Sequence, residues 1–143
     1  MKALSLWQPW ATLMAAGLKK VETRGWFTAY RGPLLIHAAK RKPKREELED
    51  ICEALEMFWD KTGIDCEILE DMTYGAILCH VGLIKCLATS SNVIPSIDEI
   101  EYWLGNYEDG RFMWTTDNLI KFDTPIPYRG SQGFFNVPDE LLP

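Results

Sequence analysis

Hydrophobic and polar positions follow two periods along this chain, one typical of strands and one typical of helices. Alternation predicts a first strand near the N-terminus, and short β-compatible or strongly apolar runs predict the others. An interior glycine, Gly82, divides the longest run, so that run is expected to form one strand with a bulge or two joined strands. The predicted strand regions are residues 2–7, 20–24, 32–39, 74–88 and, as several strands separated by glycine and proline, 110–137.

Two short helices are marked by their end residues. A helix over residues 9–17 has Pro9 in its first turn and Gly17 just past its end, the positions that these residues favour. A second short helix is predicted to begin at Ser96, because Glu99 follows three residues later and completes a capping box.

The clearest helix is predicted over residues 43–62, and Gly63 is expected to stop it. Its apolar residues fall on one stripe and its acidic residues fall elsewhere. The stripe consists of Leu48, Ile51, Cys52, Leu55, Phe58 and Trp59. Five or more short strands with two or three inserted helices favour an α+β domain built on a small curled sheet or β-barrel.

The overall composition indicates one domain, residues 1–143, with enough apolar material for a core, since 47% of the residues are hydrophobic. No apolar run reaches the length of a membrane span, so we expect no membrane contact. The N-terminus lacks the longer apolar core and the cleavage site of a signal peptide, which predicts a cytoplasmic protein.

Charge is divided unevenly along the chain. The net charge is −6, yet residues 1–45 hold ten Lys/Arg and one acid, whereas residues 46–143 hold five Lys/Arg and twenty acids. This division predicts one basic surface on an otherwise acidic body, which would attract an anion locally and suppress indiscriminate binding. The alternative is that folding mixes the two halves.

Cysteine and histidine usage gives no sign of a metal site or of another cofactor. There are four cysteines without a C-x-x-C pair, and only two histidines, His37 and His80. We expect all four cysteines to be reduced and buried among aliphatic neighbours. Both histidines are expected to be structural, with His37 a satisfied core residue of its strand.

Ionised residues crowd the short strand 20–24. Alternation places Lys20, Glu22 and Arg24 on one face of that strand and Thr23 on the other, with Lys19 in the turn before it. A carboxylate between cations is either a positioned acid–base group or part of a clamp that offers one cation to a phosphate. The alternative is an ordinary row of salt bridges.

Two further segments have the composition of a nucleic-acid site. Trp7 and Trp10 provide flat surfaces on which bases could stack, and Gln8 between them can read a base edge, although the same residues would also pack a core. Residues 40–45 form a dense basic run before a helix N-terminus, where phosphate is favoured, although a solvated loop remains an equal alternative.

Residues 5–26 (SLWQPWATLMAAGLKKVETRGW) and 30–40 (YRGPLLIHAAK) closely resemble the ASCH domain, a relative of the PUA domain. Later segments, YGAILCHVGLIKC, GRFMW and YRGSQGFFNV, look like the rest of that domain, so the resemblance spans nearly the whole chain. Its most specific element is G-x-K-x-x-E-x-R. Gly17, Lys19, Glu22 and Arg24 match this motif.

The resemblance implies a PUA-like β-barrel with packed helices and a cleft lined by the motif. It also implies binding of single-stranded RNA, or of a nucleotide or nucleoside, with Glu22 held between Lys19 and Arg24. The other residues expected to contact the ligand are Trp7, Gln8, Trp10, Tyr30, Arg31, Lys40, Arg129, Ser131 and Gln132. The sequence does not specify an oligomeric state.

Two alternatives remain open. Some relatives are hydrolases, so the domain could be a ribonuclease or a nucleoside amidohydrolase with Lys19 and Glu22 as its polar machinery. The deacetylating relatives use a threonine nucleophile where this chain has Glu22, and the adjacent Thr23 is expected on the opposite face of the strand. The weaker alternative is a protein-interaction domain whose acidic helix is the working surface.

Overall fold

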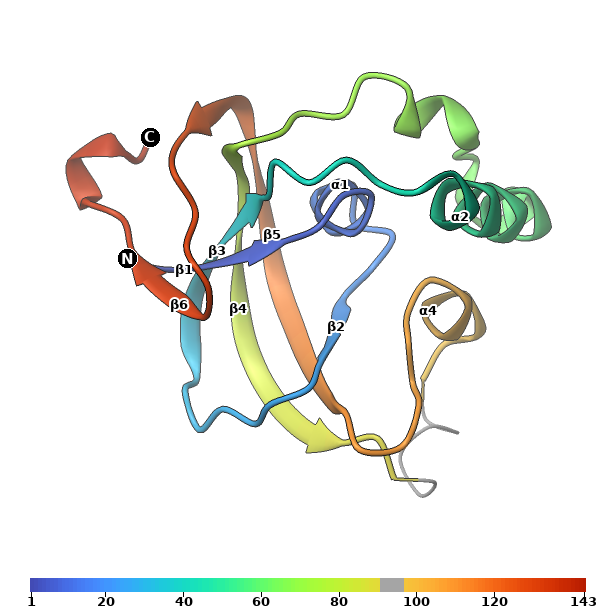
Figure 1. Cartoon of the computed structure of the whole chain (residues 1–143), viewed down its shortest axis with the longest axis horizontal. Helices are drawn as coiled ribbons and strands as arrows, with labels where there is room; N and C mark the ends of the chain where they lie inside the picture. The colour runs from blue at the N-terminus through green and yellow to red at the C-terminus, as the bar shows by residue number, and fades with distance from the viewer. Residues whose placement is uncertain (91–96) are drawn as a thin grey trace.

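The computed structural model describes residues 1–90 and 97–143. Within those residues, one curled six-stranded sheet forms half a barrel, and four α-helices pack around it (Figure 1). The predicted α+β class with a PUA-like curled sheet is therefore confirmed. The strands are β1 (Lys2–Leu6), β2 (Val21–Arg24), β3 (Gly32–Ala38), β4 (Ala76–Ala88), β5 (Phe112–Pro127) and β6 (Phe134–Asn136). The helices are α1 (Trp10–Ala15), α2 (Arg45–Met57), α3 (Trp59–Thr62) and α4 (Glu99–Trp103), with 3-10 turns η1 (Cys66–Leu69) and η3 (Asp139–Leu141).

The strand order is β2-β5-β4-β3-β1-β6, so β2 and β6 are the two edges of the sheet. β1 and β3 pair in parallel, and every other neighbouring pair is antiparallel. The charged strand predicted at residues 20–24 is thus an edge strand, paired with β5 on one side only. An edge strand leaves backbone N–H and C=O groups that other parts of the chain, or a ligand, must satisfy.

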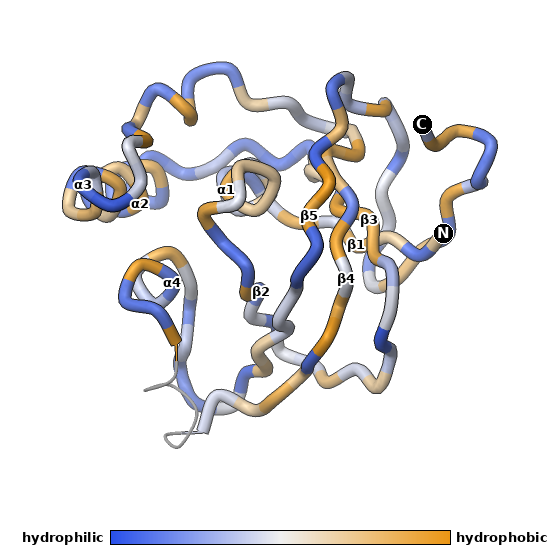
Figure 2. Tube along the Cα trace, turned by 180° about the vertical axis from the view of Figure 1, so that it is seen from behind, coloured by the Kyte–Doolittle hydropathy of each residue, from blue (hydrophilic) through white to orange (hydrophobic). Residues whose placement is uncertain are grey.

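The core has two main parts. Apolar side chains of β1, β3, β4 and α1 pack on one side of the curled sheet around the buried Trp114. A second cluster joins Leu13 of α1 to Ile51 and Leu55 of α2 and to Leu104 after α4. α2 and α4 therefore pack against each other and against α1. Figure 2 shows hydrophobic residues along β4 and hydrophilic residues between α1 and β2.

The helix predicted over residues 43–62 is present in two pieces, because α2 ends at Met57 and α3 follows Phe58. Gly63 ends α3 in the left-handed conformation (φ +64°), as predicted for a helix stop. Gly17 has φ +78° just after α1, again as predicted. The capping residue Ser96 lies outside the described residues.

β4 and β5 are more continuous than the glycines and prolines suggest. β4 is one strand through Gly82, with register shifts against β5. A Cβ atom at Gly82 would lie 2.7 Å from Oδ1 of Asp117 on β5, so the glycine leaves room for that carboxylate over the strand. β5 is one strand over residues expected to form several.

The cysteine prediction is half wrong. Cys79 and Cys86 are free and buried, as expected, and burial raises the pKa of Cys79 to about 12. Cys52 of α2 and Cys66 of η1, expected to be reduced, are joined in a disulfide. The two Cα atoms lie 5.2 Å apart because η1 folds back onto α2, a contact that local periodicity does not reveal.

No group of three or more His, Cys, Asp or Glu side chains in residues 1–90 and 97–143 is arranged to hold a metal ion. No helix in the described part of the chain combines the length and the apolar character needed to cross a membrane.

Candidate functional site

A cleft of about 1540 Å³ opens beside the edge strand β2. We call it the motif cleft, because the G-x-K-x-x-E-x-R residues Lys19, Glu22 and Arg24 line it. Its other walls come from the end of β1, from α2, from the segment after α4 and from the segment between β5 and β6. The polar residues that line it are Ser5, Lys19, Glu22, Thr23, Arg24, His37, Lys40, Glu47, Asp50, Asn106, Arg111, Arg129, Ser131 and Gln132.

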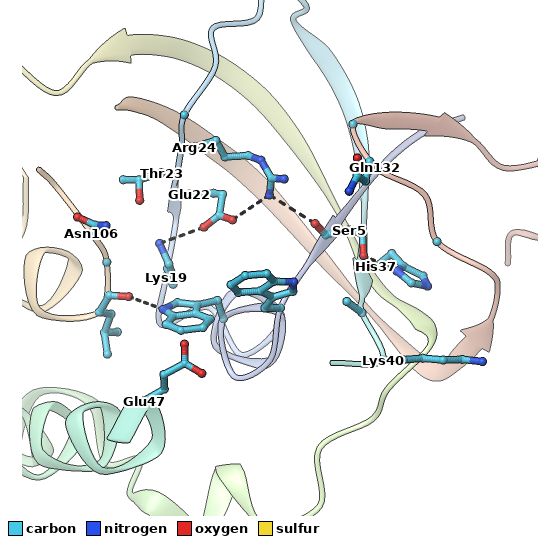
Figure 3. A pocket seen from close by; sticks show the side chains of 18 of the residues that line it. Ser5, Lys19, Glu22, Thr23, Arg24, His37, Lys40, Glu47, Asn106 and Gln132 are labelled. Atoms are coloured by element: carbon cyan, nitrogen blue, oxygen red, sulfur yellow. Dashed lines mark hydrogen bonds and ion pairs between the residues drawn. The ribbon is translucent and has the colours of Figure 1, made fainter. Parts of the chain in front are cut away.

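Glu22 lies between two cations, as the resemblance implies. Its Oε1 is 3.8 Å from Nζ of Lys19, and its Oε2 is 3.3 Å from Nη1 of Arg24 (Figure 3). The two cations differ in exposure: the side chain of Lys19 is 1% exposed and that of Arg24 is 24% exposed. Lys19 is therefore a buried counter-ion, and Arg24 is the motif cation that a ligand can reach.

The alternation predicted for β2 is confirmed. Val21 and Thr23 are buried, whereas Glu22 and Arg24 are partly exposed. Figure 3 shows the side chains of Glu22 and Thr23 on opposite sides of the strand. Thr23 does not take the place of Glu22 between the two cations.

The outer edge of β2 is held by a carboxylate from α4. Glu101 accepts a hydrogen bond from the N–H of Lys20 at 2.6 Å and another from the N–H of Val21 at 3.2 Å. Glu101 is itself buried, and burial raises its pKa, although the nearby Lys19 charge and the two N–H groups act in the opposite direction. Because these hydrogen bonds satisfy two donors at the start of the strand, they fix where the motif residues point.

Two cations satisfy carbonyl groups on the same edge. The ammonium of Lys19 donates to the carbonyl of Val21, and Nη2 of Arg111 donates to the carbonyl of Thr23 at 2.9 Å. Nearby, the hydroxyl of Tyr107 is buried without a partner among the described residues. Burial, reinforced by the charges of Glu101 and Glu22, raises the pKa of Tyr107, so this phenol stays protonated.

The two tryptophans differ in what they present to the cleft. Trp7 is 55% exposed, and the guanidinium of Arg41 lies 3.9 Å from its ring centroid. Arg41 also forms an ion pair with Glu47 at 3.0 Å, so it is held over the indole ring. Trp10 is half-buried and donates from Nε1 to the carbonyl of Leu104 at 3.1 Å, which makes it a fixed part of the wall.

The predicted role of Gln8 in reading a base edge is wrong. Gln8 is 0% exposed. Its Nε2 donates to the carbonyl of Thr73 at 2.8 Å, and its Oε1 accepts from the N–H of Thr12 at 2.9 Å. Its amide therefore ties the start of α1 to the segment before β4, and a ligand cannot reach it.

Tyr30 and Arg31, also predicted as ligand contacts, do not line the motif cleft. The hydroxyl of Tyr30 donates to the carbonyl of Pro33 at 2.6 Å, and Nη1 of Arg31 donates to the carbonyls of Thr28 and Tyr30. Both side chains brace the turn that leads into β3. The remaining predicted contacts, Lys40, Arg129, Ser131 and Gln132, all line the cleft and are exposed.

The basic run at residues 40–45 is largely engaged within the protein. Lys42 lies 3.8 Å from the ring centroid of Tyr74, and Arg45 pairs with Glu49 at 2.8 Å. With Arg41 held over Trp7, Lys40 is the member of the run that lines the cleft. Part of the basic surface expected from the charge division is therefore neutralised by acidic residues of α2.

His37 is buried and satisfied, as predicted, but it also lines the cleft beside Ser5. Ser5 and His37 are register partners on the parallel strands β1 and β3. Nδ1 of His37 lies 2.9 Å from Oγ of Ser5, and its Nε2 lies 2.8 Å from the carbonyl oxygen of Tyr128. Burial lowers the pKa of His37, against the smaller raising effect of the Tyr128 carbonyl.

Sequence reasoning missed several other lining residues, including Glu47, Asp50, Trp103, Asn106 and Arg111. Ser5 and His37 were also missed as lining residues, although the sequence held a signal for them: both lie on predicted strands and share a face once the register is known. The others lie on a helix or next to a turn, and their place at the cleft depends on how α2 and α4 pack against α1.

Comparison with known proteins identifies the family of the chain. The family model for the ASCH domain matches residues 4–125. Activating signal cointegrator 1 of Homo sapiens is 39% identical over 140 residues, which cover 96% of this chain and 22% of that protein. The Mus musculus protein of the same name is 38% identical over the same shares. The chain thus spans about a fifth of the length of these relatives, and it belongs to the ASCH domain family.

Proposed function

We propose that the motif cleft binds single-stranded RNA, or a nucleotide that carries the same groups. The observation that carries this proposal is the arrangement of Glu22 and its two cations. Lys19 and Arg24 share the single carboxylate of Glu22, so the three side chains together keep a positive charge, and Arg24 is the cation that presents it at the cleft surface. A guanidinium so placed is suited to a phosphate, which it can contact through two parallel N–H groups.

The exposed indole of Trp7 supports the binding of a base. One face of its ring is covered by Arg41, and the side chain remains 55% exposed at the mouth of the cleft. Stacking of a base on an aromatic ring contributes about 1–3 kcal/mol and tolerates any base. The pairing of Arg41 with Glu47 keeps the ring in place before the ligand arrives.

Cations elsewhere in the cleft would extend the contact along a backbone. Lys40 and Arg129 are exposed at its rim, and the protein as a whole carries a net charge of −6. Binding is therefore expected to be local and modest in affinity, with few phosphates contacted.

A titration of a fluorescent single-stranded oligoribonucleotide at low salt tests the proposal. Trp7→Ala is expected to weaken binding about 5- to 150-fold, the equivalent of one lost stacking contact. Trp59→Ala is the matched control, because Trp59 is 49% exposed and does not line the cleft. Equal losses from the two substitutions, or none from Trp7→Ala, would argue against base stacking at this site.

Hydrolysis by Lys19 and Glu22 is the second candidate. The observation in its favour is the 3.8 Å contact between a buried ammonium and a carboxylate that lines the cleft. In this reading Glu22 acts as a general base and Lys19 stabilises developing negative charge. Against it, both residues are already engaged: Lys19 by the Val21 carbonyl and Glu22 by Arg24.

A further inference from the structure

We propose that Ser5 is a nucleophile activated by His37, and that the motif cleft hydrolyses a carboxylic ester that carries a negative charge. This activity goes beyond RNA binding: it shares Arg24 with the proposed RNA site but uses neither Lys19 nor Glu22. The two side chains come from paired positions of the parallel strands β1 and β3. A nucleophile and a base on rigid neighbouring strands are held at a fixed separation, here 2.9 Å between Oγ and Nδ1.

The hydrogen bonds around His37 determine which nitrogen carries the proton. The carbonyl oxygen of Tyr128 can only accept, so Nε2 of His37, 2.8 Å away, must be the donor. In the neutral ring Nδ1 is then the acceptor, and the hydroxyl of Ser5 donates to it. Burial lowers the pKa of His37, which favours this neutral form at neutral pH. The Tyr128 carbonyl thus orients the base as a third member of the arrangement.

The segment between β5 and β6 comes close to the pair at Gly130. A Cβ atom at Gly130 would lie 2.6 Å from Cε1 and 2.8 Å from Nδ1 of His37, and 3.3 Å from Oγ of Ser5. Glycine is therefore what allows the backbone to approach so closely. Ser5 still lines the cleft, as do His37 and Gln132, and Figure 3 shows Ser5 between Arg24 and His37.

Arg24 provides positive charge next to the nucleophile. Its Nη1 lies 3.4 Å from the carbonyl oxygen of Ser5, so the guanidinium is anchored on the residue that would attack. Charge held in place before the reaction is the arrangement that stabilises a developing oxyanion. Arg129 at the exposed rim is available to the substrate's own negative charge.

The reaction transfers the acyl group of the ester first to Ser5 and then to water. Oγ of Ser5 attacks the ester carbonyl carbon while its proton moves to Nδ1 of His37. The tetrahedral oxyanion collapses, the alkoxide leaves with the proton from His37, and the acyl group stays on Ser5. Water then gives a proton to His37 and attacks the acyl-serine. The second tetrahedral oxyanion collapses to the carboxylic acid, and Oγ of Ser5 leaves with the proton from Nδ1 of His37, which restores the hydroxyl and the neutral ring.

A fluorophosphonate probe tests for the nucleophile, because it bonds to an activated serine and releases fluoride. Mass spectrometry of the labelled chain is expected to place one phosphonyl group on Ser5. Ser5→Ala should abolish labelling and His37→Gln should slow it at least about 100-fold, whereas Ser90→Ala, at an exposed serine outside the cleft, should not change it. Absence of labelling, or a label that persists in Ser5→Ala, would overturn the proposal.

Ser5→Cys gives a second readout that does not depend on Ser5→Ala folding. The introduced thiol should react with iodoacetamide at pH 7 at least about tenfold faster in the presence of His37 than with His37→Gln added. Equal rates would contradict activation by His37. For the substrate, hydrolysis of 4-nitrophenyl succinate is expected to exceed that of 4-nitrophenyl acetate at least about tenfold in kcat/KM, after subtraction of the rate without protein. Equal values would overturn the assignment of an anionic substrate.

Discussion

Oε2 of Glu101 accepts a hydrogen bond from the N–H of Lys20 at 2.6 Å, which ties α4 to the residue just before β2 across 81 positions of the chain. Its other oxygen accepts from the N–H of Val21. A residue outside the G-x-K-x-x-E-x-R motif thus holds the backbone from which Glu22 and Arg24 project. The motif specifies the charged side chains, and α4 fixes their position.

Glu101→Ala is expected to destabilise the domain. It removes the acceptor of two N–H groups at the start of β2, and an unsatisfied buried donor costs about 1–3 kcal/mol. Urea unfolding, with Glu99→Ala as the control at an exposed acid of the same helix, measures the free energy of unfolding. Equal effects of the two substitutions would show that Glu101 does not support the strand.

The adjacent lysines Lys19 and Lys20 are expected to differ sharply in their contributions to stability. Lys19 is buried against Glu22 and the Val21 carbonyl, so Lys19→Ala should lower the free energy of unfolding by at least about 2 kcal/mol. Lys20 has an exposed side chain, and Lys20→Ala should stay within about 0.5 kcal/mol of the unmodified protein. A mild effect of Lys19→Ala on stability, combined with a large loss of ligand affinity, would instead make Lys19 a ligand contact.

Much of the motif cleft could be predicted because its central feature is local. Strand alternation and the motif spacing place Glu22 with its cations within a few residues of one another. Glu101 could not be predicted, because its contact depends on α4 packing 80 positions away from Val21. Gln8 shows the reverse case: a polar residue beside exposed Trp7 looked available, yet the turn into α1 buries it.

Stability is expected to fall as the pH drops below about 6.5 because of His37. Its folded pKa is lowered from 6.5, so the unfolded chain binds the proton first and stability is lost on acidification. Glu101 has a pKa raised above 4.5, so its contribution to the free energy of unfolding increases as the pH falls, opposite to that of His37. The informative quantity is therefore the difference between the unmodified protein and His37→Gln, measured by urea unfolding from pH 7.5 to 5.5. Parallel pH profiles would contradict the prediction.

Glu22→Gln separates binding from hydrolysis by the motif residues. If Glu22 is a general base, turnover of a short RNA or an acetylated nucleoside should fall at least about 100-fold. If the cleft only binds, the substitution removes a negative charge next to the ligand, and an anionic ligand should bind equally well or slightly more tightly. We expect the second result. Robust turnover that Glu22→Gln abolishes would contradict it.

The salt dependence of RNA binding tests most directly whether the motif cleft contacts phosphates. Affinity for a labelled single-stranded oligoribonucleotide should fall with salt at a log–log slope of about −2 to −4, from roughly −0.7 per neutralised phosphate. Arg24→Gln should make that slope shallower by about 0.7, whereas Arg45→Gln, at a 90% exposed side chain outside the cleft, should leave it unchanged. Absence of binding at low salt, or a slope that Arg24→Gln does not alter, would contradict RNA binding at the motif cleft.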